Sequence, residues 1–150
     1  MDANSPELKF RVSTDSDADY LYALIEETMR PYIEATYGHW NADGARGFAN
    51  SASASGDFSI INVRDARAGA ISVSIHETYI ELAQLFLEPR FQYRGIGRRL
   101  VNDLIAQAGA ESKSIQLRVI KSNPAAAFYR RLGFEVVSED RHRFFMRYEI

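Results

Sequence analysis

The sequence predicts a mixed α/β fold in which helices cover both faces of one sheet and most strand pairs are antiparallel. Three observations predict it. Several short runs alternate apolar with polar residues, which is typical of strands with one covered face. Longer runs repeat apolar residues at helical spacing. In the middle of the chain a strand, a helix and a second strand follow one another, and such a crossover joins parallel strands.

Length and composition are those of one globular domain spanning residues 1–150. Of the 150 residues, 46% are hydrophobic and 25% are charged. The net charge of −2 and the pI of about 5.9 argue against a general nucleic-acid binder, which carries a basic excess. No apolar run approaches the roughly 20 residues of a membrane span, and residues 1–10 lack the features of a secretion signal. We therefore expect a cytoplasmic protein with no membrane or nucleic-acid partner.

The chain contains no cysteine, which excludes disulfides, zinc-thiolate sites and a cysteine nucleophile. Its histidines, His39, His76 and His142, are scattered and have none of the spacings that bind metals. We therefore expect no metal.

The first part of the chain is predicted to form one strand and two helices. Residues 8–12 form the strand. Thr14 and Asp17 have the spacing of a helix-capping box, and apolar residues follow at helical spacing. This helix is expected to end before Pro31, because proline lacks the amide hydrogen that a helix interior needs. A second helix is expected near residues 42–51.

Three strands are predicted next. Residues 58–64 and 69–76 form a hairpin around a turn at residues 65–67. Residues 79–87 form a long strand that ends just before a proline.

Helices and strands then alternate to the end of the chain. An apolar stripe predicts a helix that ends near Gly109, and the alternation at residues 115–119 predicts a strand. Asn123, followed by proline, is typical of a helix start. The last two strands are expected at residues 134–138 and 143–150.

A glycine-rich segment, residues 92–98 with the sequence QYRGIGR, lies between the long strand and the helix that follows it. Gly95 and Gly97 allow a tight turn that brings several N–H groups together, and the helix adds the positive end of its dipole. This predicts an anion site, most naturally for phosphate. No P-loop motif is present, and Leu100 stands where a dinucleotide fingerprint needs a third glycine.

The same segment resembles the Q/R-x-x-G-x-G/A motif of the GNAT superfamily of N-acetyltransferases through Gln92, Gly95 and Gly97. Residues 123–134 resemble the superfamily's second signature, with the pattern N-P-x-A-x-x-x-R-x-L-G-F and Tyr129 inside it. The order of the elements is similar over nearly the whole chain. A G-x-G loop alone is a weak signal, and a fortuitous turn would not explain the second segment. The resemblance implies a GNAT-like fold with one splayed parallel pair of strands.

The resemblance also implies acetyl-CoA as the co-substrate. The loop would hold the pyrophosphate, and the strand before it would pair through its backbone with the pantetheine arm, one N–H group facing the thioester oxygen. Asn123 would also contact the pantetheine arm, although its role as a helix cap explains it equally well. The cofactor-binding residues implied in this way are Leu85, Phe86, Leu87, Gln92, Tyr93, Arg94, Gly95, Ile96, Gly97, Arg98, Asn123, Ala126, Phe128 and Tyr129.

Two residues are implied to act in catalysis. Tyr129 would be the general acid toward the departing thiolate, whose pKa of about 8.5 makes it a fair leaving group. Glu81 has the spacing of the general base in histone-type members. The alternatives are that Glu81 is a solvent-facing strand residue and that a different group or a water chain is the base. A base is needed because an amine of pKa about 10.4 is only about 1 part in 2,500 neutral at pH 7, a cost of roughly 4.6 kcal/mol. Without cysteine, direct transfer in a ternary complex is favoured.

The acceptor side is expected in the loop after the first helix, residues 30–40, where Tyr32, Tyr37 and Trp40 would bind the amine. Ordinary packing of that loop is the alternative. The favoured function is N-acetylation of a primary amine on a small molecule, because no extra docking segment is visible. Acetylation of a protein N-terminus or lysine is one alternative, and a non-catalytic acyl-CoA-binding regulatory module is another. The resemblance also allows a homodimer.

Overall fold

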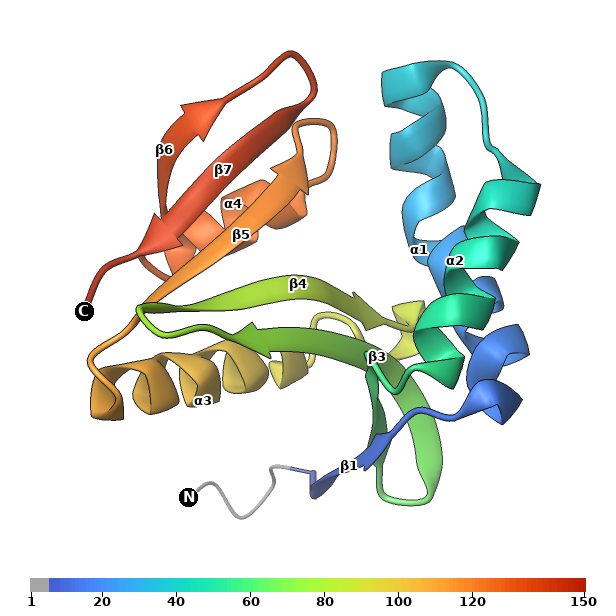
Figure 1. The fold of residues 1–150 in the computed structure, drawn as a ribbon, viewed down its shortest axis with the longest axis horizontal. Helices are drawn as coiled ribbons and strands as arrows, with labels where there is room; N and C mark the ends of the chain where they lie inside the picture. Colours follow the sequence, from blue (N-terminus) through green and yellow to red (C-terminus); the bar gives the residue numbers. More distant parts are fainter. Residues whose placement is uncertain (1–5) are drawn as a thin grey trace. The chain divides into compact units, whose positions relative to one another are not determined.

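The structure is a computed structural model that describes residues 6–150 (Figure 1). Residues 1–5 lie outside the described part. They belong to residues 1–10, from which we expect no secretion signal. The strands are β1 Leu8–Val12, β2 Ser59–Val63, β3 Ala66–Ile75, β4 Tyr79–Leu87, β5 Ser114–Ile120, β6 Glu135–Glu139 and β7 Arg143–Tyr148. The α-helices are α1 Ala18–Tyr37, α2 Ala42–Ala54, α3 Ile96–Ala110 and α4 Ala125–Arg131, and the 3-10 helices are η1 Asp15–Asp17 and η2 Pro89–Phe91.

Within the described residues the strands form one seven-stranded sheet in the order β1-β2-β3-β4-β5-β7-β6. The pair β4–β5 is parallel, whereas β1–β2, β2–β3, β5–β7 and β6–β7 are antiparallel. Together with the four α-helices of residues 6–150, this sheet confirms the predicted mixed α/β class. None of the described helices is both long enough and apolar enough to cross a bilayer.

The chain divides into two compact units. The first contains the described residues up to Thr28, together with Asn41–Ser72 and Gln84–Phe91. The second contains Met29–Trp40, Val73–Ala83 and Gln92–Ile150.

An aromatic pair lies in the core of the first unit. Phe58, just before β2, is 2% exposed, and its ring stacks on Phe86 of β4 with 6.0 Å between centroids. β3 approaches β4 so closely that a Cβ atom on Gly69 would lie 2.0 Å from the Phe86 carbonyl oxygen. Only glycine therefore fits at position 69 without a shift of the backbone.

The 3-10 helix η1, which leads directly into α1, begins with the capping box that the spacing of Thr14 and Asp17 predicts. The buried carboxylate of Asp17 accepts a hydrogen bond from the Thr14 amide at 2.9 Å. Arg11 of β1 donates two more to it, at 2.8 and 2.9 Å. These bonds satisfy an amide that the first helical turn leaves unpaired, and they join β1 to the start of α1.

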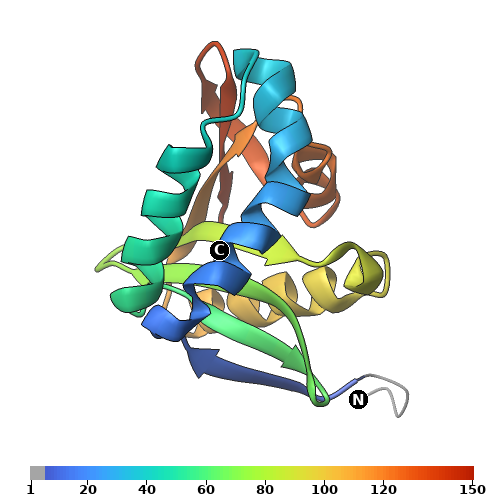
Figure 2. The ribbon, with the colours of Figure 1, turned by 90° about the vertical axis from the view of Figure 1, so that its right-hand side faces the viewer.

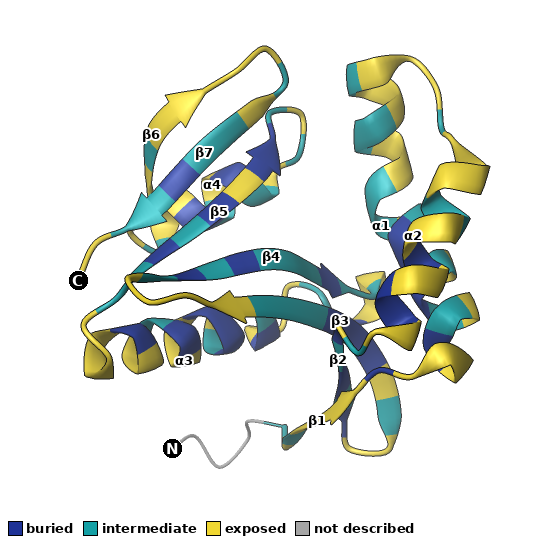
Figure 3. Ribbon diagram, viewed as in Figure 1, coloured by how far each residue is buried: buried dark blue, intermediate teal, exposed yellow. Residues whose placement is uncertain are grey.

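In the second unit, one face of β5 is apolar and covered. Ile115, Leu117 and Val119 are buried, whereas Gln116 is half-buried and Arg118 is exposed (Figure 3). Both α3 and α4 contact this strand. The apolar stripe of α3 is buried as its spacing predicts, through Ile96, Leu100, Val101, Leu104 and Ala108.

The prediction that the first helix ends before Pro31 was wrong. α1 continues through Pro31 to Tyr37, so that most of the expected acceptor loop is helical (Figure 2). A proline in a helix interior costs about 3 kcal/mol because it removes a hydrogen bond. Contacts of this segment within the second unit, such as the bond from the Ser122 hydroxyl to the Tyr32 carbonyl, help to offset that cost.

The first hairpin is tighter than predicted. Arg64 adopts a φ of 56°, which lets Val63 pair with Ala66 across a two-residue turn. β3 therefore begins at Ala66 and not at residue 69. The second helix, α2, is confirmed and runs on to Ala54, while β4 has its predicted bounds.

Candidate active site

The parallel strands β4 and β5 pair only at their beginnings. Their ladder runs from the pair Tyr79–Ser114 to the pair Glu81–Gln116. Beyond Gln116, β5 keeps its pairing with β7 but has no further pairing with β4 in the described part of the chain. The half-buried side chain of Glu81 therefore lies at the point where the two strands part.

The glycine-rich loop leads into α3 through left-handed backbone conformations. Gly95, with a φ of 82°, precedes the helix, and Tyr93 has a φ of 60° and a fully exposed side chain. Among the residues that the structure describes, no side chain caps the first turn of α3 by a hydrogen bond. The Arg99 amide is bonded to the Gly95 carbonyl at 3.0 Å, so the amides of residues 96–98 are those that the helix itself does not pair.

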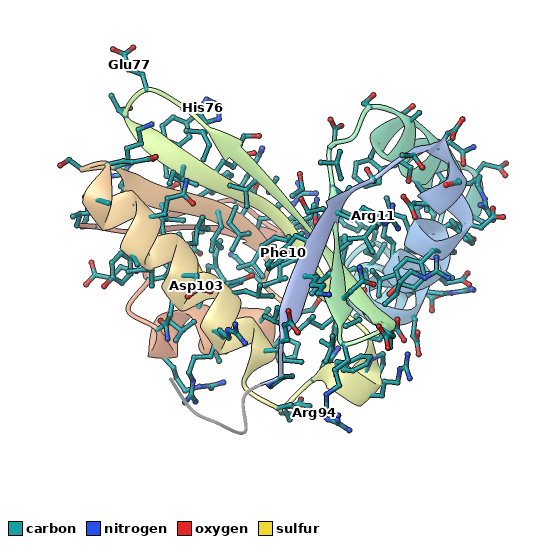
Figure 4. The ribbon with its side chains drawn as sticks, turned by 90° about the horizontal axis from the view of Figure 1, so that it is seen from below. Phe10, Arg11, His76, Glu77, Arg94 and Asp103 are labelled. Carbon is teal, nitrogen blue, oxygen red and sulfur yellow. The ribbon has the colours of Figure 1, made fainter. Side chains whose placement is uncertain are left out.

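This loop has the features that bind a phosphate group. The first-turn amides of α3, at residues 96–98, have no partner within the helix and lie at the positive end of its dipole. The side chain of Ile96 is 3% exposed and anchors the turn in the core. Arg98 is exposed on the first turn, and Figure 4 shows Arg94 at the outer edge of the loop. The loop can therefore hold a diphosphate mainly through its backbone.

Tyr129 lies on α4 in the same unit, with its side chain buried. Its ring stacks on Phe128 at 5.3 Å and meets Phe134 edge-on at 5.6 Å. Burial raises the pKa of Tyr129 to about 12. The hydroxyl is therefore protonated at neutral pH, and it can donate a hydrogen bond but cannot serve as a base.

Asn123 caps α4, as its position before proline predicts. Its Oδ1 atom accepts a hydrogen bond from the Ala125 amide at 2.9 Å, and Pro124 between them has helical backbone angles. Its Nδ2 atom lies 3.8 Å from the sulfur of Met29 on α1. Asn123 therefore has a structural role as the cap of α4, and a contact with a ligand is compatible with that role.

The other residues that the resemblance implies for cofactor binding belong partly to the second unit and partly to the first. Ala126 is buried and Phe128 is half-buried on α4, in the same unit as the loop. Leu85, Phe86 and Leu87, at the end of β4, belong to the first unit, where Phe86 is a core residue.

The predicted acceptor residues all belong to the second unit. Tyr32 and Tyr37 lie on the last turns of α1, and Trp40 follows the helix end, with its indole Nε1 buried and without a hydrogen-bond partner among the described residues. The Tyr37 ring is 4.9 Å from the ring of His142, which lies in the turn between β6 and β7. The segment thus faces a histidine that its own sequence does not reveal.

Sequence reasoning missed the residues that hold this segment. Ser122 is bonded to the Tyr32 carbonyl and to the Thr36 hydroxyl, and His142 packs on Tyr37. No local pattern marks these contacts, because they join residues far apart in the chain. Among residues 6–150, no group of three or more histidine, aspartate or glutamate side chains is placed to hold a metal ion.

Comparison with known proteins points to one family. A family model described as an acetyltransferase (GNAT) domain matches residues 34–148. No protein of curated function matches the sequence.

Several solved structures share the fold. PaiA N-acetyltransferase from Thermoplasma acidophilum, in complex with coenzyme A, is 19% identical with a TM-score of 0.71, over 96% of this chain and 99% of that one. An acetyltransferase from Thermus thermophilus is 18% identical with a TM-score of 0.73, over 95% and 97%. Naa50 from Arabidopsis thaliana, in complex with the bisubstrate analogue CoA-Ac-MVNAL, is 18% identical with a TM-score of 0.64, over 95% and 99%. At these identities the likeness is one of fold.

Proposed function

We propose that this chain, which belongs to the GNAT family of acetyltransferases, moves the acetyl group of acetyl-CoA to a primary amine on a small molecule. The observation that carries the proposal is the uncapped first turn of α3 behind the left-handed turn at Gly95. Such a turn presents backbone amides to a diphosphate. We further propose that residues 1–150 act as one domain, in the cytoplasm, alone or as a homodimer.

The proposed cofactor contacts are those of the loop, β4 and α4. Residues 92–98 would hold the pyrophosphate through their amides, with Arg94 and Arg98 adding positive charge. The backbone of Leu85, Phe86 and Leu87 would pair with the pantetheine arm, and Asn123 would contact the same arm. Bound acetyl-CoA supplies an activated acetyl group, and the chain supplies position and hydrogen bonds.

Glu81 is the proposed general base. It lies where β4 and β5 part, and a half-buried carboxylate there can take a proton from an ammonium group directly or through water. Tyr129 is the proposed general acid. Because its pKa is raised to about 12, its hydroxyl would stabilise the departing thiolate by a hydrogen bond. The chain has no cysteine to carry the acetyl group, which favours direct transfer within a ternary complex.

Tyr32, Tyr37 and Trp40 are the proposed acceptor-side residues. Their aromatic rings can attract an ammonium group. A protein N-terminus is the second candidate acceptor, because the structurally similar Naa50 is bound to an analogue that joins coenzyme A to a peptide.

A thiol-release assay tests the proposal, and the absence of cysteine means that the protein adds no thiol background. The panel contains spermidine, tyramine, the peptide Met-Val-Asn-Ala-Leu, and an N-terminally blocked peptide with one lysine. We expect the kcat/KM of the better small amine to exceed that of both peptides by about tenfold or more, which is about 1.4 kcal/mol of transition-state stabilisation.

Each other outcome has its own meaning. Preference for the free peptide N-terminus would make the chain a protein N-terminal acetyltransferase, and preference for the blocked peptide would make it a lysine acetyltransferase. Calorimetric binding of acetyl-CoA with no thiol release from any amine would support the regulatory module. Failure to bind acetyl-CoA would refute the cofactor assignment.

A further inference from the structure

The turn between β5 and α4 is connected to the end of α1. Three consecutive residues of the turn make this connection: Lys121, Ser122 and Asn123. The Ser122 hydroxyl oxygen lies 3.1 Å from the Tyr32 carbonyl oxygen and 3.0 Å from the Thr36 hydroxyl oxygen. A hydroxyl has one proton, and a carbonyl can only accept. Ser122 therefore donates to Tyr32, and Thr36 donates to Ser122. One exposed serine thus bonds to two positions on α1.

The two neighbours of Ser122 reinforce this connection. The Nδ2 atom of Asn123 lies 3.8 Å from the sulfur of Met29. The Lys121 amide donates to the His142 carbonyl at 2.8 Å, and the His142 ring packs against Tyr37. The last turns of α1 are therefore held at several points by the turn at 121–123, directly or through the β6–β7 turn.

The same turn also starts the helix that carries Tyr129. Asn123 caps α4 through its bond to the Ala125 amide at 2.9 Å. In the proposed function Asn123 contacts the pantetheine arm, while the segment Met29–Trp40 binds the acceptor. Ser122 thus lies between the two proposed substrate sites and belongs to neither.

We propose that Ser122 is a positioning residue, which transmits the binding of coenzyme A at Asn123 to the acceptor-side segment Met29–Trp40. The inference rests on the proposed function. A ligand that orders Asn123 also orders its neighbour, and through the Ser122 hydroxyl it orders the end of α1. Without that hydroxyl the Tyr32 carbonyl keeps its partner within the helix, so α1 remains folded but loses both of its hydrogen bonds to Ser122.

Trp40 offers a direct measurement, because it is the only tryptophan of the chain and ends this segment. The experiment titrates the intact protein with coenzyme A, following tryptophan emission and, separately, calorimetric heat. The wild type should show a saturable change in emission whose midpoint matches the calorimetric Kd. In Ser122→Ala the amplitude of that change should fall about fivefold or more, while the calorimetric Kd stays within about twofold.

Two further variants make the result specific. Ser122→Thr restores a hydroxyl and should restore the amplitude. Ser138→Ala removes an exposed serine from β6 in the same unit and should behave as the wild type. Thermal unfolding of each variant shows whether the fold is intact.

Three outcomes would overturn the inference: a full amplitude in Ser122→Ala, an equal loss in Ser138→Ala, or no emission change in a wild type that binds coenzyme A by calorimetry. A wild type that shows no calorimetric binding would instead refute the proposed function, and the inference would fail with it.

Discussion

Tyr129 shows how burial determines what a single side chain can contribute to a reaction. Its pKa is raised to about 12, whereas a thiol has a pKa of about 8.5, so full transfer of the phenol proton to a thiolate is strongly unfavourable. A hydrogen bond from the protonated phenol avoids that cost. Of the acid roles open to a tyrosine, the structure therefore favours hydrogen-bond donation.

Replacing Tyr129 with phenylalanine tests this role. The variant keeps the ring that packs on Phe128 and Phe134, so the fold should persist. We expect kcat to fall about 100-fold, while the KM for acetyl-CoA stays within about twofold, because only the hydrogen bond to the leaving group is lost. Steady-state thiol release measures both constants.

Tyr148→Phe is the matched control, since that tyrosine contacts the same Phe134 ring at 5.5 Å and has no proposed role in catalysis. Its kcat should equal that of the wild type. An unchanged kcat in Tyr129→Phe, or an equal fall in Tyr148→Phe, would show that the hydroxyl of Tyr129 does not act in the reaction.

Asp17 makes the stability of the fold depend on pH. Hydrogen bonds from Arg11 lower the pKa of this carboxyl below its ordinary value of 3.8, and the Thr14 amide adds to the effect. The pKa of Asp17 is lower in the folded than in the unfolded chain. The contribution of its carboxylate to the free energy of unfolding is therefore fully present above the unfolded pKa, and it is lost as the pH falls through the folded pKa. We expect Asp17→Asn to lower the free energy of unfolding by about 1 kcal/mol at neutral pH.

Urea unfolding on both sides of that pH range measures the effect. The difference between the wild type and Asp17→Asn should shrink toward zero at the acid end. Asp15→Asn, an exposed carboxylate in the same 3-10 helix, should show much less change. A difference that does not depend on pH would mean that the charge of Asp17 is not what stabilises the capping box.

At the level of elements, sequence patterns predict the helices and strands whose bounds depend on residues near them in the chain. Strand β4 has its predicted bounds, because an apolar run marks the strand and Pro89 follows its end. Helix α1 does not have its predicted end. The free-energy cost of Pro31 can be read from the local sequence, whereas the contacts that offset it come from residues far away in the chain. The bonds of Ser122 to Tyr32 and Thr36 join residues 90 and 86 positions apart, and no sequence pattern marks them.

The close approach of β3 to β4 gives a test of element packing. Gly69→Ala would place a Cβ atom 2.0 Å from the Phe86 carbonyl oxygen, which is backbone and cannot turn aside. We expect a loss of about 1–3 kcal/mol in the free energy of unfolding, or failure to fold. Gly109→Ala lies on α3, where the added Cβ would have no atom of another described element within 4 Å, and it should be neutral or stabilising by up to about 1 kcal/mol.

Chemical denaturation of the two alanine variants compares them under one set of conditions. The two should differ in sign or differ by more than about 1 kcal/mol. Equal stability would mean that β3 and β4 move apart at little cost, and that Gly69 does not determine how they pack.

At the scale of the whole molecule, a ligand that binds only the folded chain raises its unfolding temperature. At about 100 times its Kd, coenzyme A should stabilise the fold by about 2.7 kcal/mol, which corresponds to about 5–11 °C for a chain of this size. This shift reports the cofactor assignment without any knowledge of the acceptor amine.

Gly97→Leu should abolish that shift while leaving the unliganded protein folded. Leucine favours a helix more than glycine does, and Gly97 is the second residue of α3, so the unfolding temperature without ligand should be equal or higher. The added side chain would occupy the space over the first-turn amides, where the diphosphate is proposed to bind. Scanning fluorimetry with and without coenzyme A measures both temperatures, with Gly109→Ala as the control that keeps the full shift. If Gly97→Leu were stabilised as much as the wild type, coenzyme A would bind elsewhere on the molecule, and the loop at 92–98 would be a turn without a ligand.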